Sequence, residues 1–304
     1  MDRVQHLGPI DGDGGNMPFL GVAGIFVGHS PSSLVVTVAS VTCNGAGWIV
    51  AFLHAKSNKM PIATSPLADR VALITGAGRG IGRAIALRLA QAGAATVLAA
   101  RTEDTLLTVA ETVRASGAEA LVVPTDVTND QQLEGLVNTT LTRFGHIDIL
   151  VNNAGGGPPR APVVKARMGD WQWTLRVNLW ATMVLTKLVL PSMVERQSGA
   201  IVNICSLAGL TGRAGEAAYA AAKFGVRGFS QSLFEEVREH GIKVSTICPG
   251  YVDTALIPPN RRVDRSKMLS PEDVAEAVYG VVVSPARCCP VEIVLHSQHD
   301  PIKT

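Results

Sequence analysis

Two side chains in the second half of the chain have the types and the spacing of a proton-transfer site. Tyr219 and Lys223 stand four residues apart in an alanine-rich, helix-like segment, so on a helix they share one face and the ammonium lies close to the phenol. A neighbouring cation favours the phenolate form of a tyrosine. Such a tyrosine can donate a proton when a carbonyl is reduced and accept one when an alcohol is oxidised.

A glycine-rich run upstream is a candidate phosphate-binding loop. It comprises Thr75, Gly76, Ala77, Gly78, Arg79, Gly80, Ile81 and Gly82, and the helix-like segment 83–92 follows it. Glycines let the backbone turn sharply and approach a phosphate with no Cβ in the way, and the N-terminus of the next helix directs free N–H groups at a pyrophosphate. Glycines alone also suit a flexible turn, but this place between an apolar run and a helix favours dinucleotide binding.

Seven short apolar runs alternate with helix-like segments from Arg70 onward. They are rich in β-branched residues and apolar on both faces, which is typical of parallel strands with helices packed on each side. We therefore predict an α/β fold, a doubly wound (Rossmann) three-layer α/β/α sandwich with a seven-stranded parallel sheet. The predicted strands are Val71–Thr75, Ala95–Ala99, Ala120–Pro124, Ile147–Val151, Ala200–Ile204, Lys243–Cys248 and Val291–Leu295.

The TGxxxGxG spacing of the glycine-rich run resembles that of the short-chain dehydrogenase/reductase family, in its compact branch. Over about residues 66–300 the chain carries further motifs of that family in the same order. They are Asn152-Asn153-Ala154-Gly155 after the fourth strand, Asn178 in the next helix, Ser206 after the fifth strand, Tyr219 and Lys223 as YxxxK, and Pro249-Gly250 with Val252 and Thr254 after the sixth strand. The chain is similar to 3-oxoacyl-[acyl-carrier-protein] reductase-like members.

This resemblance implies hydride transfer between nicotinamide C4 and a carbonyl carbon, with a catalytic tetrad of Asn178, Ser206, Tyr219 and Lys223. Tyr219 would transfer the proton, and Lys223 would also bind the nicotinamide ribose. Ser206 would donate to the substrate oxygen, and Asn178 would hold a water that connects Lys223 to solvent. Each residue has a simpler alternative: a packed ring, a surface charge, the cap of a turn or a backbone hydrogen bond. We expect Cys205, where relatives often have a second serine, not to contact the tetrad.

The end of the second strand predicts NADP (NADPH) as the cofactor. Ala100 stands where NAD-preferring relatives often carry an acid that accepts from the ribose 2′-OH. Arg101 and Arg79 can instead bind a 2′-phosphate, although either can be a solvated surface residue. Asp126 with Val127 resembles the family's adenine contact, and Asp126 can also be a helix N-cap. The expected cofactor-binding residues are Thr75, Gly76, Gly78, Arg79, Gly80, Ile81, Gly82, Arg101, Asp126, Val127, Asn153, Ala154, Gly155, Tyr219, Lys223, Pro249, Gly250, Val252 and Thr254.

In this family the segment between Thr254 and Ser270 covers the substrate. Here it is short and basic, with Arg261, Arg262, Arg265 and Lys267 against Asp264. It can attract a phosphopantetheine carrier or coenzyme A, or it can be a solvated lid only. We expect a small-molecule carbonyl or alcohol as substrate, with a carrier-bound 3-oxoacyl thioester as one candidate. The alternatives are an alcohol, hydroxy-acid or sugar dehydrogenase on the same scaffold, and a non-catalytic NADP-binding sensor.

Charge, cysteines and apolar helices bear on the partners of the protein. Lys+Arg 27 against Asp+Glu 25 is too even a balance for a nucleic-acid binder. Five cysteines without CxxC or Cys/His ligand spacing predict neither a disulfide framework nor a metal site, and we expect a cytoplasmic protein. The segments Asp170–Val194 and Gly215–Ser232 are too apolar for exposed helices, and by resemblance they pair between subunits in a homodimer or homotetramer.

Residues 1–59 differ in composition from the rest. Gly14–Ala55 contains no Asp, Glu, Lys or Arg, and within it Leu34–Leu53 is long enough to cross a membrane. We divide the chain into an N-terminal apolar extension, 1–59, and a short-chain dehydrogenase/reductase domain, 60–304. The extension is a leader, an anchor through residues 19–53, a patch on the domain, or sequence upstream of a true start at Met60.

Overall fold

The computed structural model describes residues 21–22, 25–30, 33–38, 41–42, 65–157, 160–257 and 263–302. The chain divides into two units, Met1–Ala63 and Thr64–Thr304. In the first unit the described residues form two antiparallel strand pairs, β1 (Gly21–Val22) with β4 (Val41–Thr42) and β2 (Ile25–Ser30) with β3 (Ser33–Val38). The described part of the run Leu34–Leu53 is therefore strand, and the rest of that run lies outside the described residues.

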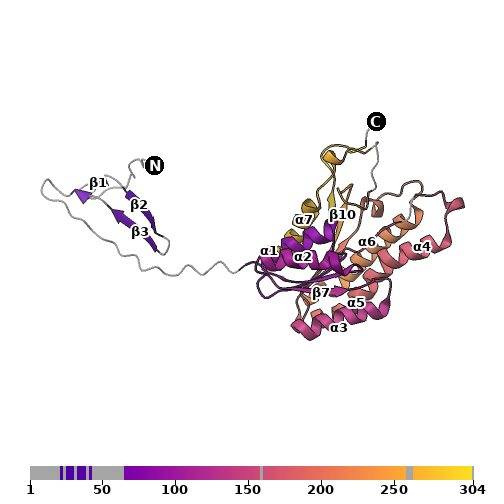
Figure 1. Cartoon of the computed structure of the whole chain (residues 1–304), viewed down its shortest axis with the longest axis horizontal. Coiled ribbons are helices and arrows are strands. Elements are labelled where there is room, and N and C mark those ends of the chain that lie inside the picture. Colours follow the sequence, from indigo (N-terminus) through magenta and orange to yellow (C-terminus); the bar gives the residue numbers. More distant parts are fainter. Residues whose placement is uncertain are drawn as a thin grey trace. The chain divides into compact units, whose positions relative to one another are not determined.

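The second unit is built on a parallel sheet of seven strands (Figure 1), as the sequence predicts. Each strand begins and ends within two residues of its predicted bounds. The chain winds from a central strand to one edge and then returns to the other side of that strand, which makes the fold doubly wound. In order across the sheet the strands are β11 (Glu292–Leu295), β10 (Ile242–Pro249), β9 (Gly199–Ile204), β8 (Ile149–Asn152), β5 (Val71–Thr75), β6 (Ala95–Ala100) and β7 (Ala120–Pro124).

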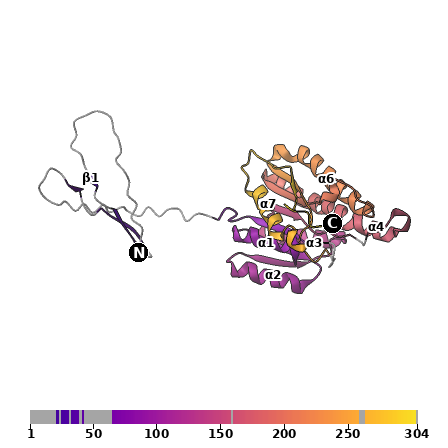
Figure 2. The ribbon, with the colours of Figure 1, turned by 90° about the horizontal axis from the view of Figure 1, so that it is seen from above.

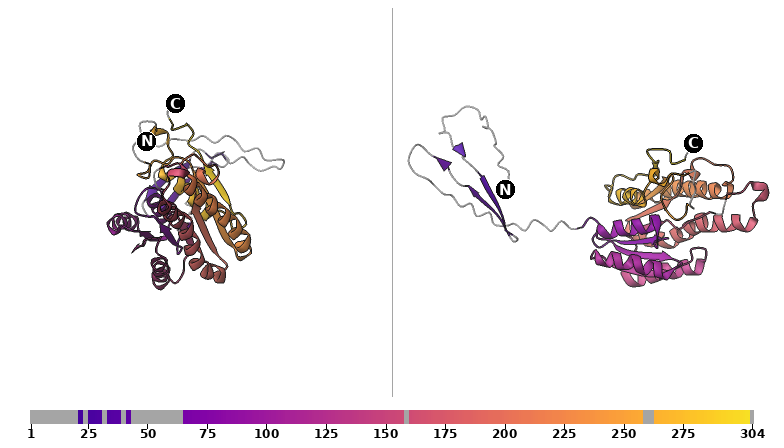
Figure 3. Two further views of the ribbon diagram at one scale, coloured as in Figure 1. Left: turned by 90° about the vertical axis from the view of Figure 1, so that its right-hand side faces the viewer. Right: turned by 45° about the horizontal axis from the view of Figure 1, so that its top comes forward.

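Helices cover both faces of this sheet (Figures 1 and 2). On one face α1 (Gly80–Gln91), α2 (Glu103–Ala115) and α7 (Pro271–Val283) share a core with Ile74 of β5. On the other face α3 (Asp130–Phe144), α5 (Ala181–Arg196) and α6 (Ala217–Val237) share a core with Leu73. Neighbouring residues of β5 thus belong to opposite layers, which explains why its first four residues are all apolar. Figure 3 shows the same layers in two further views.

The helical run that leads into the second core is interrupted by a π-helical turn. It consists of α4 (Met168–Leu175), the π-helix Arg176–Trp180 and α5. Among the described residues, Met168–Arg196 is the one helical run with the length and apolar composition of a membrane span. Its inner side chains, such as Leu185 and Val189, are buried in the core of the domain, as in the central helix of a globular protein.

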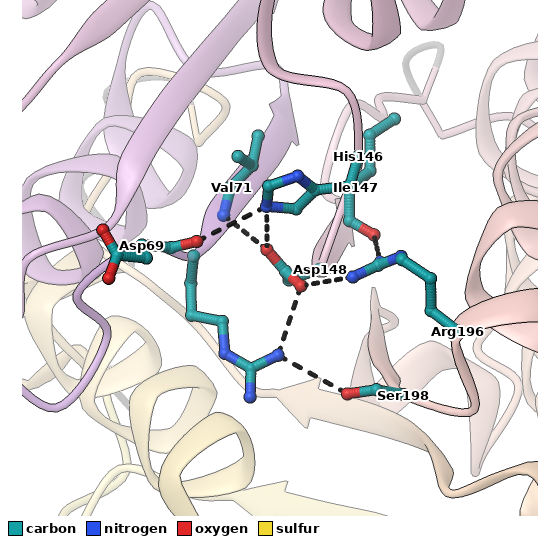
Figure 4. Close-up of polar contacts among 8 residues, drawn as sticks. Asp69, Val71, His146, Ile147, Asp148, Arg196 and Ser198 are labelled. Atoms are coloured by element: carbon teal, nitrogen blue, oxygen red, sulfur yellow. Dashed lines mark hydrogen bonds and ion pairs between the residues drawn. The ribbon is translucent and has the colours of Figure 1, made fainter.

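A charged network closes the amino-terminal edge of the sheet (Figure 4). Asp148, just before β8, is 4% exposed and accepts a hydrogen bond from the Val71 N–H at 2.8 Å. Its carboxylate also lies 2.8 Å from Arg196 Nη1, 3.2 Å from Arg70 Nη1 and 3.2 Å from His146 Nε2. Burial raises the pKa of Asp148, but the hydrogen bonds from Arg196 and Val71 outweigh burial and leave the pKa below its ordinary range.

Candidate active site

The glycine-rich run forms the turn from β5 into α1, at the carboxyl edge of the sheet. Gly76 (φ +67) and Gly80 (φ +53) adopt a left-handed conformation that residues with a Cβ rarely take. A Cβ on Gly82, in the first turn of α1, would collide with the carbonyl oxygen of Gly76. The first turn of α1 carries no acidic side chain, so the positive end of the helix dipole is open to a phosphate. This turn fits the pyrophosphate of a dinucleotide.

Thr75 and Asn153 join this loop to the end of β8. Thr75 Oγ1 accepts hydrogen bonds from the backbone N–H groups of Asn153 and Ala154, both at 3.0 Å. Asn153 Nδ2 donates to the Thr75 carbonyl at 2.8 Å. β5 and β8 are neighbours at the point where the strand order reverses, which is where doubly wound sheets bind their ligands. Both side chains therefore shape the loop, and their contact with a cofactor stays a prediction.

The end of β6 carries no acidic side chain. Ala100 is the last residue of the strand, and Arg101 after it and Arg79 before α1 are both exposed.

Asp126, after β7, binds the residue two positions further on. Its Oδ1 accepts hydrogen bonds from the N–H and the hydroxyl of Thr128, at 2.9 and 2.8 Å. The alternative that Asp126 caps α3 is wrong, because Asn129 holds the N-cap position and its side chain accepts from Gln132 N–H.

Tyr219 and Lys223 lie one turn apart on α6. Lys223 Nζ is 5.7 Å from the centroid of the Tyr219 ring and donates to the Ile204 carbonyl, at the end of β9, at 3.0 Å. Lys223 is 4% exposed, so it is not the surface charge of the simpler interpretation. The end of the sheet holds this buried ammonium beside the phenol.

Asn178 lies in the π-helical turn and is buried. Its Nδ2 donates to the Gly156 carbonyl at 2.6 Å and to the Thr174 carbonyl at 2.9 Å. A Cβ on Gly155 would lie 2.7 Å from Asn178 Oδ1 and 3.6 Å from Lys223 Nζ. The backbone hydrogen bonds of the simpler alternative are thus present, and they hold the amide across Gly155 from Lys223. Such π-helical turns are frequent at functional sites.

Ser206 follows β9 and caps the short helix Leu207–Gly209. Its Oγ accepts a hydrogen bond from the Ala208 N–H at 3.1 Å, so the capping alternative describes a contact that exists. A hydroxyl that accepts one hydrogen bond keeps its own proton to donate. The cap therefore orients Ser206 and leaves its O–H available to a carbonyl oxygen.

Cys205 contacts the tetrad, so the expectation that it stands apart is wrong. Its Sγ donates to the Lys223 backbone carbonyl at 3.3 Å, because the end of β9 packs directly against α6. A hydrogen bond with the Cys248 thiol lowers the pKa of Cys205, burial opposes this shift, and the Lys223 ammonium adds to it. Cys205 therefore contacts the segment of α6 that carries Lys223.

A pocket of about 790 Å³ is lined by both Ser206 and Tyr219. Its apolar walls include Trp171 and Leu207, and the lid contributes Leu256, Ile257 and Val263. Within the lid Arg265 pairs with Asp253 and donates to the carbonyls of Thr254 and Ile257, both at 3.0 Å. This cation is therefore engaged inside the lid, whereas Arg261 and Arg262 lie outside the described residues.

The polar residues of the pocket that were not predicted from the sequence include Arg160, Arg213 and Tyr251. Tyr251 directly follows Pro249-Gly250, and Arg213 lies between Ser206 and Tyr219. Their positions beside recognised motifs are the one signal that the sequence offers for them.

Comparison with known proteins identifies the family of the chain. Residues 70–264 match the family profile described as short chain dehydrogenase. The chain belongs to the short-chain dehydrogenase family. Both the family and the α/β fold predicted from the sequence are thereby confirmed.

This short-chain dehydrogenase has relatives in bacteria. It is 37% identical over 219 residues to an uncharacterized oxidoreductase of Staphylococcus aureus. This alignment covers 72% of this chain and 93% of the relative. It is 36% identical over 227 residues to the 3-oxoacyl-[acyl-carrier-protein] reductase of Synechocystis sp., with 72% and 92% covered.

Solved structures of the family share its fold. A metagenomic short-chain oxidoreductase in complex with NADP matches with a TM-score of 0.69 and 32% sequence identity. The match covers 78% of this chain and 100% of that chain. Levodione reductase matches with a TM-score of 0.71 and 29% identity, over 76% of this chain and 97% of that chain.

Proposed function

We propose that this oxidoreductase uses NADPH to reduce a carbonyl compound to an alcohol, with Tyr219 as the general acid. The observation that carries the proposal is the convergence of Ser206 and Tyr219 on one pocket, with the buried Lys223 ammonium held beside the Tyr219 ring. The reduced nicotinamide, when bound, supplies the hydride, and the protein must orient the substrate and provide the proton.

The proposed proton path uses the four residues of the predicted tetrad. Ser206 donates to the carbonyl oxygen, where negative charge develops during reduction. Tyr219 transfers its hydroxyl proton to that oxygen, which becomes the hydroxyl of the product. The Lys223 ammonium stabilises the phenolate that remains, and Asn178 on the far side of Gly155 holds the water through which the proton is replaced.

Several observations support NADP over NAD. Ala100 leaves the end of β6 without a carboxylate that would repel a 2′-phosphate, and the exposed Arg101 and Arg79 can form charge-assisted hydrogen bonds with it. The metagenomic relative was solved with NADP.

A 3-oxoacyl thioester is one candidate for the carbonyl substrate, and two alternatives to carbonyl reduction also make testable predictions. Similarity to the Synechocystis sp. 3-oxoacyl-[acyl-carrier-protein] reductase supports a 3-oxoacyl thioester as the substrate. Turnover of 3-oxoacyl coenzyme A derivatives would test this candidate. Oxidation of an alcohol, hydroxy acid or sugar by NADP is the same chemistry in reverse and requires Tyr219 as a base. A non-catalytic sensor would bind NADPH without turning over any carbonyl or alcohol.

We also propose a homodimer or homotetramer formed through α4, α5 and α6. Trp173 is 41%, Trp180 is 44% and Phe224 is 44% exposed, and large side chains of this kind are enriched at protein interfaces. Light scattering on the purified protein would give the mass, and a monomer would contradict this proposal.

The experiment that tests the function is a screen of ketones, aldehydes and 3-oxoacyl thioesters that follows NADPH absorbance, with alcohols and NADP for the reverse direction. Tyr219→Phe keeps the ring and removes the proton donor, so we expect NADPH to bind normally while turnover falls roughly 10²- to 10⁴-fold. Near-normal turnover in this variant would refute the role of Tyr219. Absence of turnover with every carbonyl and alcohol, despite NADPH binding, would leave only the sensor.

A further inference from the structure

Arg213 lines the pocket and lies between Ser206 and Tyr219 in the sequence. It belongs to the loop that joins Ser206 to Tyr219 and lines the pocket together with both. Its Nη1 donates to the Tyr251 hydroxyl at 3.0 Å, and its guanidinium carbon is 5.6 Å from the centroid of the Tyr251 ring. Tyr251 lines the same pocket from the loop after β10. The hydrogen bond and the ring therefore hold an exposed guanidinium at the pocket wall.

The carboxylates of the described pocket lining do not form an ion pair with Arg213. In the described lining the carboxylates belong to Glu216 and Asp170. Glu216 pairs with Arg160, whose Nη2 is 2.5 Å from Glu216 Oε1. Burial lowers the pKa of Arg160, but hydrogen bonds to Tyr251 and Glu216 outweigh it and leave the pKa above its ordinary value. Asp170 lies in the first turn of α4, three residues after Arg167. No carboxylate among the described residues forms an ion pair with Arg213.

We propose that Arg213 and Tyr251 bind a carboxylate carried by the substrate itself, so that the enzyme selects oxo acids over neutral carbonyl compounds. A guanidinium has planar paired donors that match a carboxylate, and the phenol hydroxyl adds one donor more. The pocket lining also includes apolar side chains, among them Leu207, Ile257 and Val263, which suit the carbon chain between the carboxylate and the carbonyl. The inference rests on the proposed function in one respect: it places the reacting carbonyl at Ser206 and Tyr219.

Matched substrates test the proposal on the full chain with NADPH at low ionic strength. The pairs are levulinate with its methyl ester, and the two homologues of levulinate with one or two more methylenes, each with its ester. For the preferred acid we expect Arg213→Gln to lower kcat/KM roughly 10- to 100-fold, mainly through KM. The corresponding ester should change by less than about 3-fold, and Arg213→Lys should restore part of the acid's kcat/KM.

Control variants separate this contact from a general positive potential. Arg143→Gln removes the same charge from an exposed pair with Glu119 and should leave the acid-to-ester ratio of kcat/KM unchanged. If Arg167→Gln weakens the acid as much as Arg213→Gln does, the potential of the pocket selects acids and the assignment to Arg213 is wrong. Tyr251→Phe should raise the KM of the acid without changing that of the ester.

Two further measurements keep this proposal separate from the proposed function. Calorimetry of levulinate and its homologues with the NADP complex needs no turnover, and we expect acid binding that Arg213→Gln weakens. If the protein reduces esters as well as acids and Arg213→Gln has no effect, the carboxylate site is wrong and the reductase stands. If no carbonyl is reduced but acids bind through Arg213, the reductase is wrong and the site stands. If Arg213→Gln impairs acetoacetyl coenzyme A but neither the oxo acids nor acetoacetyl-N-acetylcysteamine, the site takes a phosphate, and the substrate-carboxylate proposal is overturned.

Discussion

Asp148→Asn is the substitution whose effect on stability the structure defines most directly. It exchanges a carboxylate for an amide of nearly the same shape at the amino-terminal edge of the sheet, within the network of Figure 4. The carboxylate receives the Val71 N–H at 2.8 Å and Arg196 Nη1 at 2.8 Å on different oxygens. Asparagine keeps one of these acceptors and turns an NH₂ group toward the other donor, so at least one of the two bonds is lost.

The magnitude follows from the number of charged contacts and their exposure. A hydrogen bond to a charged group contributes about 1.5–3 kcal/mol, and the substitution weakens those from Arg196 and Arg70 as well as the backbone bond. Arg196 is 30% exposed and Arg70 is 47% exposed, so water compensates part of the loss. We expect the free energy of unfolding to fall by about 2–4 kcal/mol. For a domain of this size that corresponds to a Tm lower by roughly 5–15 °C.

The pH dependence has a defined sign. The pKa of Asp148 is lowered in the folded protein, so its contribution is complete above the ordinary carboxyl value of about 3.9 and is lost as the pH falls through the lowered value. The difference in unfolding free energy between wild type and Asp148→Asn should therefore persist from neutral pH down to about pH 5 and shrink below about pH 4.

Urea unfolding followed by circular dichroism across this pH range measures both quantities. Glu119→Gln is the matched control, because it removes a carboxylate from the pair with Arg143 in which the side chains are 47% and 56% exposed. Surface pairs of this kind contribute about 0–1 kcal/mol. Equal effects of the two substitutions at pH 7, or a difference that grows as the pH falls below 4, would refute the argument.

Two further predictions concern the cofactor and the extension. Ala100→Asp with Arg101→Ala should reverse the preference from NADPH to NADH, because the new carboxylate accepts from a ribose hydroxyl and repels a 2′-phosphate; fluorescence titration measures both affinities, and equal wild-type affinities would contradict the NADP assignment. A chain that begins at Met60 should remain soluble and turn over at the full-length rate, because the seven-stranded sheet draws all its strands from residues after it; an inactive shortened chain beside an active full-length one would show that residues 1–59 belong to the fold.

The fold could be predicted because its local and global signals agree. The strand over Val71–Thr75 is apolar at its first four positions, and the structure buries all five residues between two helical layers. The glycines of the following turn are required by backbone conformation and by close packing, as at Gly76 and Gly82. Such requirements restrict which residue types can stand at a fixed spacing, so they can be predicted from a single sequence.

The contacts that complete the site could not be predicted from the sequence in this way. The π-helical turn at Asn178 depends on how α4 and α5 pack against the loop after β8. The composition of Arg176–Trp180 alone does not predict a π-helix. The same holds for Cys205, whose contact with Lys223 arises only because β9 and α6 pack together. Arg213 and Tyr251 come from different loops, which follow the neighbouring strands β9 and β10, and the pairing of these strands brings both residues to one pocket.

The position of Lys223 shows what the sheet adds to a helical motif. The four-residue spacing from Tyr219 places the ammonium on the correct face of α6, but a lysine side chain is long and flexible enough to turn away from a phenol. The Ile204 carbonyl holds Nζ at the end of β9, and the missing side chain of Gly155 leaves room for it beside Asn178. Because these constraints come from β8 and β9, the parallel edge of the sheet, rather than the helix alone, determines where the charge lies. The tyrosine-lysine spacing is therefore informative about function mainly in a chain that also supplies that edge.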